Sequence, residues 1–497
     1  MTKTACLAGA ALAALLSTTV AAQTSEEATK VYLDQIKARN DLLHAVIAVN
    51  PAALAEAKAL DAERKAGKVR SAIHGRPILL KDNIEANDGL ATTAGSLALK
   101  NNVTGRDAPL VKGLRAAGAV LLGKANLSEW ANIRSNHSIS GWSAMGGTAR
   151  NPYVLDRSAC GSSSGSGVAV AAGLAWAAIG TETDGSITCP AAINGLVGLK
   201  PTVGLVSRTH IIPISHSQDT AGPMTTTVKD AADILTAIAG SDPADGATKA
   251  ADSHKTDYAR GLSKDALKGV TLAVARFYTG YSPKTDLVFE QALADLKAQG
   301  ATLVEVKDFD EGPIGKAEGV VLYTELKVDL AAYLASTDPK TVPTRTLADL
   351  IAFNKATPKE FEWFGQESFE RAEKTKGYSD PDYIKALADS QRMAGPEGID
   401  RILKEAGAVA MVAPTTGPAW TIDPLNGDNY GGSSTTLPAV AGYPHLTVPM
   451  GDVSGLPVGL SFIGPAWSEA LLLNLGYAYE QATMKRKAPT FLKTIAP

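Results

Sequence analysis

Two short loops rich in serine and glycine lie on either side of one apolar segment. Residues 162–166 read SSSGS, residues 183–186 read TDGS, and residues 168–179 between them are almost wholly apolar. Glycine gives up side-chain contacts and costs conformational entropy, so such loops are expected where the backbone must approach a ligand or adopt unusual dihedral angles. A serine hydroxyl in such a loop can act as a nucleophile if a base lies nearby. The stretch from Cys160 to Lys200 is therefore the first candidate for a site.

The residue pattern argues against metal and phosphate chemistry. The seven histidines are scattered, and the chain has neither a His-Glu-x-x-His motif nor cysteines at zinc-binding spacing. It also lacks the glycine-rich phosphate loop that ends in Gly-Lys-Ser or Gly-Lys-Thr. We therefore expect an enzyme that needs neither a metal ion nor a cofactor.

One serine pattern suggests a hydrolase of a different class. Residues 161–165 satisfy Gly-x-Ser-x-Gly with Ser163 at the centre. In α/β-hydrolases this motif follows directly on a strand, whereas residues 153–160 read YVLDRSAC, which is a poor strand sequence. Such a triad would also need a later acid and His445. An esterase that uses Ser163 is thus one alternative.

The sequence more closely resembles the amidase signature family, whose serine hydrolases use a Ser-Ser-Lys triad. The matching residues are Lys81, Ser162 and Ser186, and the two serines are 24 positions apart (186 minus 162). The resemblance covers most of the chain from about Ala52 to Pro449 and depends on the order and spacing of several blocks. These blocks are residues 80–83, 92–95, 123–126, 161–166, 180–190, 198–202 and 219–223.

The chemistry of amides explains these residue types. An amide carbonyl is a poor electrophile, so the serine needs a base, and a lysine can serve only if burial or nearby positive charge lowers its pKa. Lys81 ends the apolar run Ile78-Leu79-Leu80, which would desolvate it. The resemblance implies that Ser162, preceded by a cis peptide bond, bridges Lys81 and Ser186. Ser186 would attack, and its proton would pass through Ser162 and Lys81 to the leaving ammonia.

The resemblance also implies the groups that would surround the substrate. The backbone N–H groups of Thr183, Asp184, Gly185 and Ser186 would form the oxyanion hole. Candidate substrate-binding residues are Trp130, Asn132, Asn136 and Asp184. A packing role suits Trp130, Asn132 and Asn136 about equally well, and this alternative remains open.

Within the family, the chain resembles bacterial peptide amidases, which convert the C-terminal amide of a peptide to a carboxylate and ammonia. Many relatives have glycine in place of Asp184 and arginine in place of Thr188. An arginine would suit a substrate that carries a carboxylate, so its absence fits a neutral peptidyl amide. A broad-specificity aliphatic or aryl amidase, and a non-catalytic binding protein that keeps the scaffold, remain alternatives.

The first 22 residues have the pattern of a secretory signal. Lys3 precedes an apolar run from residue 5 to residue 16, and small residues at positions 20–22 suit cleavage. We therefore expect a periplasmic or secreted protein. No later segment reaches the roughly 18 apolar residues of a membrane span. The net charge of −3 carries no signature of nucleic-acid binding, so the expected partner is a small-molecule or peptide amide, and the protein a monomer or homodimer.

Two cysteines remain after removal of the signal, Cys160 and Cys189. An exported protein permits a disulfide bond between them. Each lies within three positions of a candidate catalytic serine, so if the serines meet in space the cysteines could meet as well. Two buried, unreactive thiols are the alternative.

Strand-like and helix-like segments alternate along the chain, which is typical of an α/β fold. Strands are expected at residues 76–83, 119–124, 268–277, 301–306, 408–413, 445–449 and 458–462, and residues 168–179 are expected to form one buried helix. Residues 217–224 read as a loop. Residues 23–497 should form one amidase domain with a mixed, mostly parallel central sheet covered by helices on both faces. The charged, proline-punctuated residues 316–405 should be a helical insertion in it.

Overall fold

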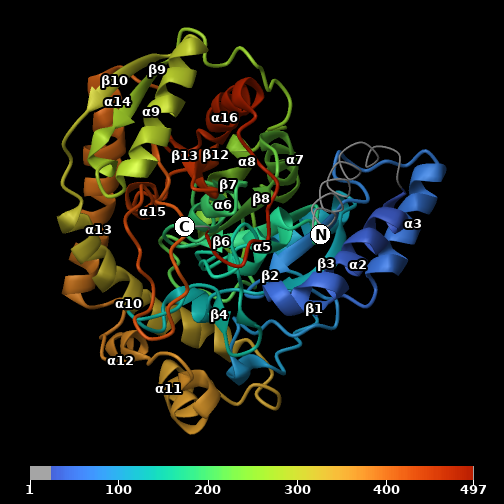
Figure 1. Cartoon of the computed structure of the whole chain (residues 1–497). Coiled ribbons are helices and arrows are strands. Elements are labelled where there is room, and N and C mark those ends of the chain that lie inside the picture. Colours follow the sequence, from blue (N-terminus) through green and yellow to red (C-terminus); the bar gives the residue numbers. More distant parts are fainter. Residues whose placement is uncertain (1–23, 496–497) are drawn as a thin grey trace, which may run out of the picture.

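The computed structural model describes residues 24–495, so the predicted signal at residues 1–22 lies outside the described residues. A large central sheet lies between layers of helices (Figure 1). The strands are β1 (Val46–Val49), β2 (Pro77–Lys81), β3 (Val120–Ala125), β4 (Trp142–Ser143), β5 (Gly147–Thr148), β6 (Ala177–Glu182), β7 (Val197–Lys200), β8 (Thr220–Thr225), β9 (Thr271–Ala275), β10 (Thr302–Val306), β11 (Ala410–Pro414), β12 (His445–Val453) and β13 (Leu456–Ile463). The prediction of a single α/β domain is confirmed.

Helices connect most of the strands and cover the sheet (Figure 1). The α-helices are α2 (Ser25–Leu43), α3 (Ala53–Lys65), α4 (Pro109–Ala116), α5 (Ser164–Ala171), α6 (Thr188–Ile193), α7 (Val228–Ile238), α8 (Ala251–His254), α9 (Pro283–Ala298), α10 (Gly312–Ala335), α11 (Leu347–Ala356), α12 (Glu367–Glu373), α13 (Pro381–Ala394), α14 (Arg401–Ala406), α15 (Thr436–Val440) and α16 (Glu469–Thr483). None of the described helices is long and apolar enough to span a membrane.

The sheet has eleven strands in the order β1-β3-β2-β6-β8-β7-β12-β13-β11-β9-β10. Parallel pairs form two blocks, β3-β2-β6 and β11-β9-β10. The strands between these blocks, and β1 at the edge, pair antiparallel. The sheet is therefore mixed, as expected, and strands from both sides of the helical segment join one continuous sheet.

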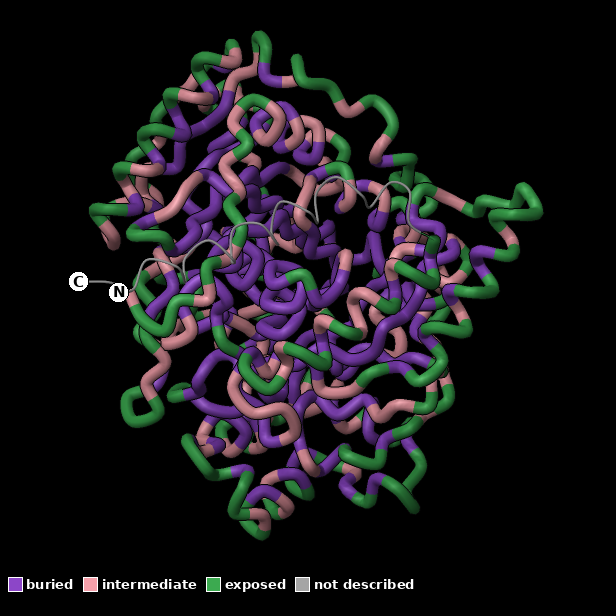
Figure 2. The backbone as a smooth tube through the Cα atoms, turned by 45° about the vertical axis from the view of Figure 1, so that its right-hand side comes forward, coloured by how far each residue is buried: buried purple, intermediate pink, exposed green. Residues whose placement is uncertain are grey.

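Both faces of the sheet are buried under helices. Along β2, Ile78 and Leu80 belong to the core on one face, which includes residues of α4, α7, α9 and α16, while Leu79 belongs to the core on the other face with α2, α3 and α5. Buried residues accordingly fill the interior, and exposed residues lie at the periphery (Figure 2). A strand buried on both faces reads as a continuous apolar run, which is why residues 78–80 are uniformly apolar.

The prediction of one buried helix over residues 168–179 is wrong. Helix α5 ends at Ala171, Gly173 adopts a φ of +72°, and the chain then enters strand β6 at Ala177. Ala178 packs toward one face of the sheet, and Ala177 and Ile179 pack toward the other. A central strand without polar alternation cannot be distinguished from a buried helix by periodicity alone.

The prediction of a loop over residues 217–224 is also wrong in its second half. Residues 220–225 form β8, which lies between β6 and β7 near the middle of the sheet. Gly222 and Pro223 made this segment look like a turn. The glycine is required by packing, because a Cβ atom there would lie 2.0 Å from the carbonyl oxygen of Leu199. Strands β1 and β7 were not expected either.

The helical segment between β10 and β11 runs from α10 to α14, residues 312–406. It includes the expected insertion at residues 316–405. Leu326, Leu330 and Leu334 on one side of α10 share a hydrophobic cluster with Trp130 and Phe369. The segment therefore packs against loops that follow the first strands of the sheet, and it reaches the region of the candidate site.

Candidate active site

Lys81 is the last residue of β2, and its side chain is completely buried. Its Nζ atom lies 2.7 Å from Ser162 Oγ, 2.8 Å from Thr181 Oγ1 and 3.1 Å from the carbonyl oxygen of Thr181. A neutral amine has two N–H groups and one lone pair. The two Thr181 oxygens can accept the N–H groups, which leaves the lone pair for the hydroxyl proton of Ser162. The geometry is that of a base directed at Ser162.

Burial adjusts Lys81 to this role. Complete burial lowers the pKa of Lys81 to about 7, and the more distant carboxylates of Asp219 and Glu182 oppose this effect. No carboxylate oxygen in residues 24–495 forms an ion pair with Lys81. Lys124 differs, because its Nζ lies 3.6 Å from the carboxylate of Asp82. A buried lysine without a charged partner stays neutral down to a lower pH than a solvent-exposed lysine does, as a general base requires.

The first serine loop leads into α5. The peptide bond between Gly161 and Ser162 is cis, as the resemblance implies. Ser162 is completely buried, and its carbonyl oxygen accepts a hydrogen bond of 3.0 Å from the backbone N–H of Ser128. These contacts fix Ser162 beside Lys81.

The second serine loop follows β6 and is held at both ends by carboxylates, of which Glu182 is buried and Asp219 partly buried. Glu182 accepts hydrogen bonds from the backbone N–H groups of Ile187, at 2.7 Å, and Thr188, at 2.8 Å. Asp219 accepts a hydrogen bond of 2.6 Å from the hydroxyl of Thr183. Sequence reasoning missed both acids, although Glu182 directly precedes the loop and Asp219 stands in one of the matching blocks.

The backbone of this loop is exposed to the candidate site. The backbone N–H groups of Asp184, Gly185 and Ser186 donate to no acceptor among the described residues. Gly185 adopts a φ of +78°, and a Cβ atom there would lie 3.1 Å from Thr435 Oγ1. A side chain at this position would be strained and crowded. The free N–H groups beside Ser186 are the donors that an oxyanion hole needs.

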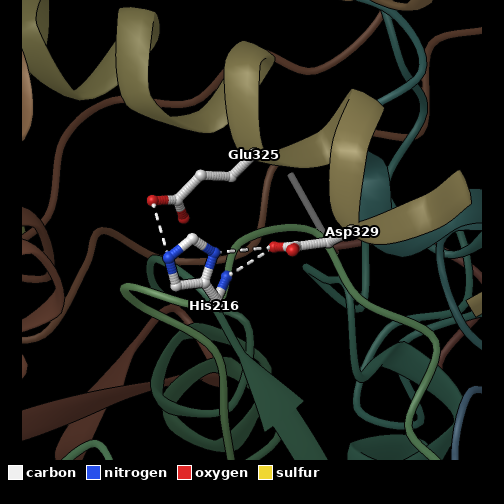
Figure 3. Close-up of side chains that lie close together, drawn as sticks. All are labelled: His216, Glu325 and Asp329. Atoms are coloured by element: carbon white, nitrogen blue, oxygen red, sulfur yellow. Dashed lines mark hydrogen bonds and ion pairs between the residues drawn. The ribbon is translucent and has the colours of Figure 1, made fainter. Parts of the chain in front are cut away.

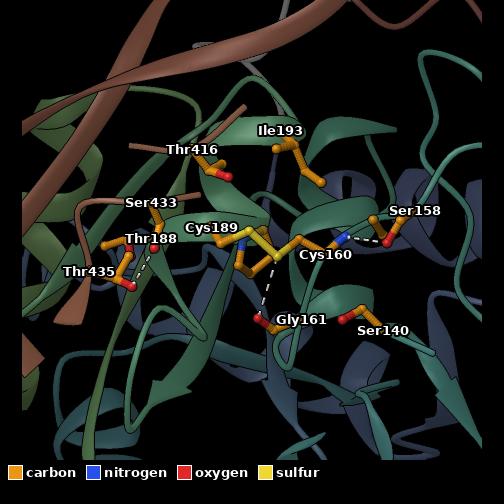
Figure 4. The surroundings of a disulfide bond; sticks show 12 residues. Ser140, Ser158, Cys160, Gly161, Thr188, Cys189, Ile193, Thr416, Ser433 and Thr435 are labelled. Carbon is orange, nitrogen blue, oxygen red and sulfur yellow. Dashed lines mark hydrogen bonds between the residues drawn. A yellow bond between two sulfur atoms is a disulfide. The ribbon is translucent and has the colours of Figure 1, made fainter. Parts of the chain in front are cut away.

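Two links join the serine loops. The backbone N–H of Ser163 donates to the carbonyl oxygen of Ser186 at 3.1 Å. Cys160 and Cys189 form a disulfide bond, with their Cα atoms 6.1 Å apart (Figure 4). The disulfide considered in the sequence analysis is thus present in the structure. Ser162 and Ser186 lie in adjacent loops that are cross-linked to each other.

Removing this disulfide should destabilise the protein. The bond joins residues 29 positions apart. Closing a loop of this size lowers the conformational entropy of the unfolded chain, which stabilises the folded protein by about 3–4 kcal/mol at 25 °C. We expect the Cys160→Ser, Cys189→Ser double variant to lose about this free energy of unfolding in urea titrations. The unmodified protein should show the same loss under reducing conditions, and a reductant should not affect the double variant. Equal free energies of unfolding for the oxidised unmodified protein and the double variant would contradict the prediction.

A cavity of about 360 Å³ opens beside Ser186. Its lining includes Gly161, the second serine loop, both cysteines, and residues of the segment 420–436. Among the predicted substrate-binding residues, Asn132 and Asp184 line this cavity. Sequence reasoning did not identify Trp420, Asp428 and Tyr430, which also line it, because they come from a loop far along the chain.

Trp130 and Asn136 do not line this cavity. Trp130 is buried in the cluster that α10 covers, where its ring packs edge-on against Phe369 at a centroid distance of 5.8 Å. Asn136 accepts a hydrogen bond of 3.1 Å from Ser368 Oγ. Both residues thus fit the packing alternative, and they connect the site loops to the helical segment.

The structure does not bring Ser163 and His445 into a common site. Ser163 Oγ donates to the carbonyl oxygen of Thr181 at 3.1 Å and accepts from its N–H at 3.2 Å, so it is engaged with the backbone of β6. His445 is buried on β12, and its Nε2 lies 2.6 Å from Ser461 Oγ. Burial lowers the pKa of His445 to about 3. These contacts assign both residues to the core.

The chain is similar to known amidases over most of its length. The family model described as Amidase matches residues 27–473. The solved structure of native peptide amidase from Stenotrophomonas maltophilia is 51% identical, with a TM-score of 0.89 and coverage of 97% of each chain. A probable amidase of Arabidopsis thaliana is 39% identical over 481 residues, which are 94% of this chain and 89% of the relative.

A further relative is named for a different role. One component of the glutamyl-tRNA(Gln) amidotransferase of Moorella thermoacetica is 35% identical over 472 residues, covering 92% of this chain and 93% of its own length. The shared sequence therefore spans nearly the whole length of each of these relatives. The chain belongs to the amidase signature family and is a hydrolase that cleaves the carbon–nitrogen bond of amides.

Proposed function

We propose that this enzyme hydrolyses the C-terminal amide of peptide amides, releasing a peptide with a free carboxylate and ammonia. The observation that carries the proposal is the chemistry of the cavity beside Ser186. Among the described residues, its lining contains no lysine or arginine, and its charged members are the acids Asp184 and Asp428. Such a cavity suits a neutral or cationic substrate. Similarity to the Stenotrophomonas maltophilia peptide amidase supports the same substrate class.

The arrangement of Lys81, Ser162 and Ser186 supports the following reaction. Ser186 Oγ attacks the amide carbon as its proton moves to Ser162 Oγ, and the Ser162 proton moves to neutral Lys81. The oxygen of the tetrahedral intermediate carries the negative charge, and the free N–H groups of the second loop stabilise it. The carbon–nitrogen bond then breaks as a proton returns from Lys81 through Ser162 to the leaving nitrogen, which departs as ammonia.

A water molecule then hydrolyses the acyl-enzyme along the same proton path. It attacks the carbonyl carbon of the ester on Ser186 and gives its proton to the same Ser162–Lys81 relay. The serine–acyl bond breaks and Ser186 regains its proton, and the peptide's new carboxylic acid loses its proton to solvent or to the released ammonia and leaves as a carboxylate. The acids that face the cavity then favour product release, because a new carboxylate is repelled by Asp184 and Asp428.

Substrate choice distinguishes this proposal from a broad-specificity amidase. We expect kcat/KM for a dipeptide or tripeptide amide to exceed that for the matching free amino-acid amide and for an aryl amide by about tenfold or more, since neighbouring residues of the peptide add binding energy. Ammonia release from the three substrates measures this ratio. The same peptide with a free C-terminus is the control and should release no ammonia. Faster hydrolysis of the aryl amide would favour the broad-specificity alternative.

We also propose that the enzyme is exported. The basic start, apolar run and small residues within positions 1–22 support this proposal, and a disulfide bond such as that between Cys160 and Cys189 is typical of oxidising compartments. Expression of the full chain in a bacterium, followed by cell fractionation and N-terminal sequencing, tests it. We expect periplasmic activity and a mature chain that begins near Gln23. An uncleaved chain confined to the cytoplasm would contradict it.

A further inference from the structure

Helix α10 provides two acids that hold neighbouring parts of the candidate site. Glu325 accepts hydrogen bonds from the hydroxyls of Ser215 and Ser217 and from the backbone N–H of Ser217. One turn along the helix, Asp329 accepts from the backbone N–H and the ring Nδ1 of His216, each at 3.0 Å (Figure 3). The segment 215–217 is thereby fastened to the helical insertion.

This cluster contains residue types that bind metal ions, but its carboxylate oxygens already accept hydrogen bonds. Ligand atoms of His216, Glu325 and Asp329 lie within 4.8 Å of one another, which their spacing in the sequence did not indicate. Tyr383 also donates to Glu325, and Tyr378 donates to Asp329, so every carboxylate oxygen of the pair already accepts a hydrogen bond. We therefore interpret the cluster as a clamp between α10 and the segment 215–217.

A third acid of α10, Glu318, reaches the second serine loop, residues 183–186, which we call the oxyanion loop. Gln218 Nε2 donates to Glu318 Oε1 at 2.9 Å and to the carbonyl oxygen of Thr183 at 3.3 Å. The carboxyl groups of Glu318 and Asp184 lie close enough to share a hydrogen bond, and Asp184 is two residues before Ser186. Two carboxyl groups can form such a bond only if one of them carries a proton.

The surroundings of Asp184 show where this proton lies. Thr436 Oγ1 donates to Asp184 Oδ2 at 2.8 Å, and the hydroxyl of Thr435 also stabilises the charged form of Asp184. The Oδ1 atom is buried and has no N–H or hydroxyl donor in hydrogen-bond geometry among the described residues. A buried carboxylate oxygen without a donor is costly. A protonated Glu318 supplies the missing donor. Glu318 is thus the neutral partner and Asp184 the charged one.

The other titratable groups near this pair come from several elements. Glu311, which caps the start of α10, accepts a hydrogen bond from Tyr278. Lys200 ends β7, Glu182 ends β6, and Tyr430 lines the cavity. Burial, followed by the charges of Asp184 and Glu311, raises the pKa of Glu318 to about 8. Burial raises the pKa of Glu311 to about 7 and lowers that of Lys200 to about 8.

We propose that Glu318 is a positioning residue, which holds the oxyanion loop through a proton that it shares with Asp184. Loss of this proton places two negative carboxylates side by side. They repel each other and move the Thr183–Ser186 backbone, and their charge opposes the oxyanion that the same backbone must stabilise. Hydrolysis therefore stops as the pH rises through the titration of the pair. This inference rests on the roles proposed for Ser186 and its loop.

The pH dependence of kcat tests the proposal. The wild-type enzyme should lose activity on the alkaline side, and the Glu318→Gln variant should keep kcat at neutral pH within about threefold, because glutamine still donates to Asp184 and cannot ionise. Its alkaline limb should move up by about one pH unit or more. Asp184→Asn, which removes the same repulsion from the other side, should shift the limb likewise. Glu318→Ala should lower kcat by about tenfold with little change in KM, and glutamine should restore it.

Glu480→Gln is the matched control. Burial also raises the pKa of Glu480, to about 7. This carboxylate accepts a hydrogen bond from the backbone N–H of Val228, the first residue of α7, and does not line the cavity beside Ser186. Its replacement should leave the alkaline limb in place. An alkaline limb that persists unchanged in both Glu318→Gln and Asp184→Asn would overturn the proposal.

A readout that needs no turnover separates this inference from the proposed function. The infrared band of a protonated carboxyl group should disappear on raising the pH, and the wild-type titration should contain one such loss that the Glu318→Gln spectrum lacks. If this signal is present but peptide amides are not hydrolysed, the proposed substrate is wrong and the shared proton stands. If peptide amides are hydrolysed and the signal is absent, the inference about Glu318 is wrong.

Discussion

Replacing Ser186 by alanine should reduce kcat for amide hydrolysis by about 10⁴-fold or more, because the acyl-enzyme can no longer form. Ser186 lines the cavity, lies beside free backbone N–H groups and is joined to the Lys81–Ser162 pair through the adjacent loop. Ammonia release from a peptide amide, measured over hours at high enzyme concentration, gives the residual rate. Unchanged thermal unfolding of the variant shows that the loss is chemical.

Two nearby serines provide the controls for this result. Ser166 is buried in α5, and its hydroxyl has no hydrogen-bond partner among the described residues, so Ser166→Ala removes no hydrogen bond and should retain nearly full activity. Ser163→Ala removes the two hydrogen bonds to Thr181 and should cost about 1–3 kcal/mol of stability while leaving an active enzyme. Full activity in Ser186→Ala together with complete loss in Ser163→Ala would establish the esterase-like alternative instead.

Replacing Lys81 by alanine should reduce kcat/KM by about 10³–10⁴-fold, in the range of a lost general base. The wild-type enzyme should show the corresponding acid limb. Because burial lowers the pKa of Lys81 to about 7, a falling pH protonates the amine, which then cannot accept the Ser162 proton, and the rate declines below about pH 7. Measuring kcat/KM between about pH 5 and about pH 9 gives this profile.

Lys81→Arg tests whether charge or basicity matters at this position. An arginine stays protonated throughout the accessible pH range, so it should be as inactive as alanine even though it can donate to Thr181 and Ser162. Substantial activity in Lys81→Arg, with the acid limb of the wild type unchanged, would show that another group is the base. The alkaline limb assigned to Glu318 is independent of this outcome, since it reports a carboxyl group on a different element.

The sequence alone predicted much of the outer architecture. The charged, proline-punctuated composition of residues 316–405 predicted helices there, and β2 and β3 were recognised as short apolar runs flanked by polar residues. Such signals are local, because a surface helix or a bounded strand carries its pattern within its own residues. The middle of the sheet was less predictable. Strands β6 and β8 are buried on both faces, or contain glycine and proline for close packing, so their local pattern does not reveal their place.

The residue types of the site were likewise set by the sequence, through the order and spacing of blocks around Lys81, Ser162 and Ser186. Their arrangement was decided by tertiary structure, because Lys81 and Thr181 meet only when β2 and β6 pair side by side. The same holds for Asp428 and Glu318, which reach the cavity region from segments more than 100 positions after Ser186. A carboxyl group acquires a raised pKa only from the burial and charges that folding brings around it, and no spacing along the chain encodes these.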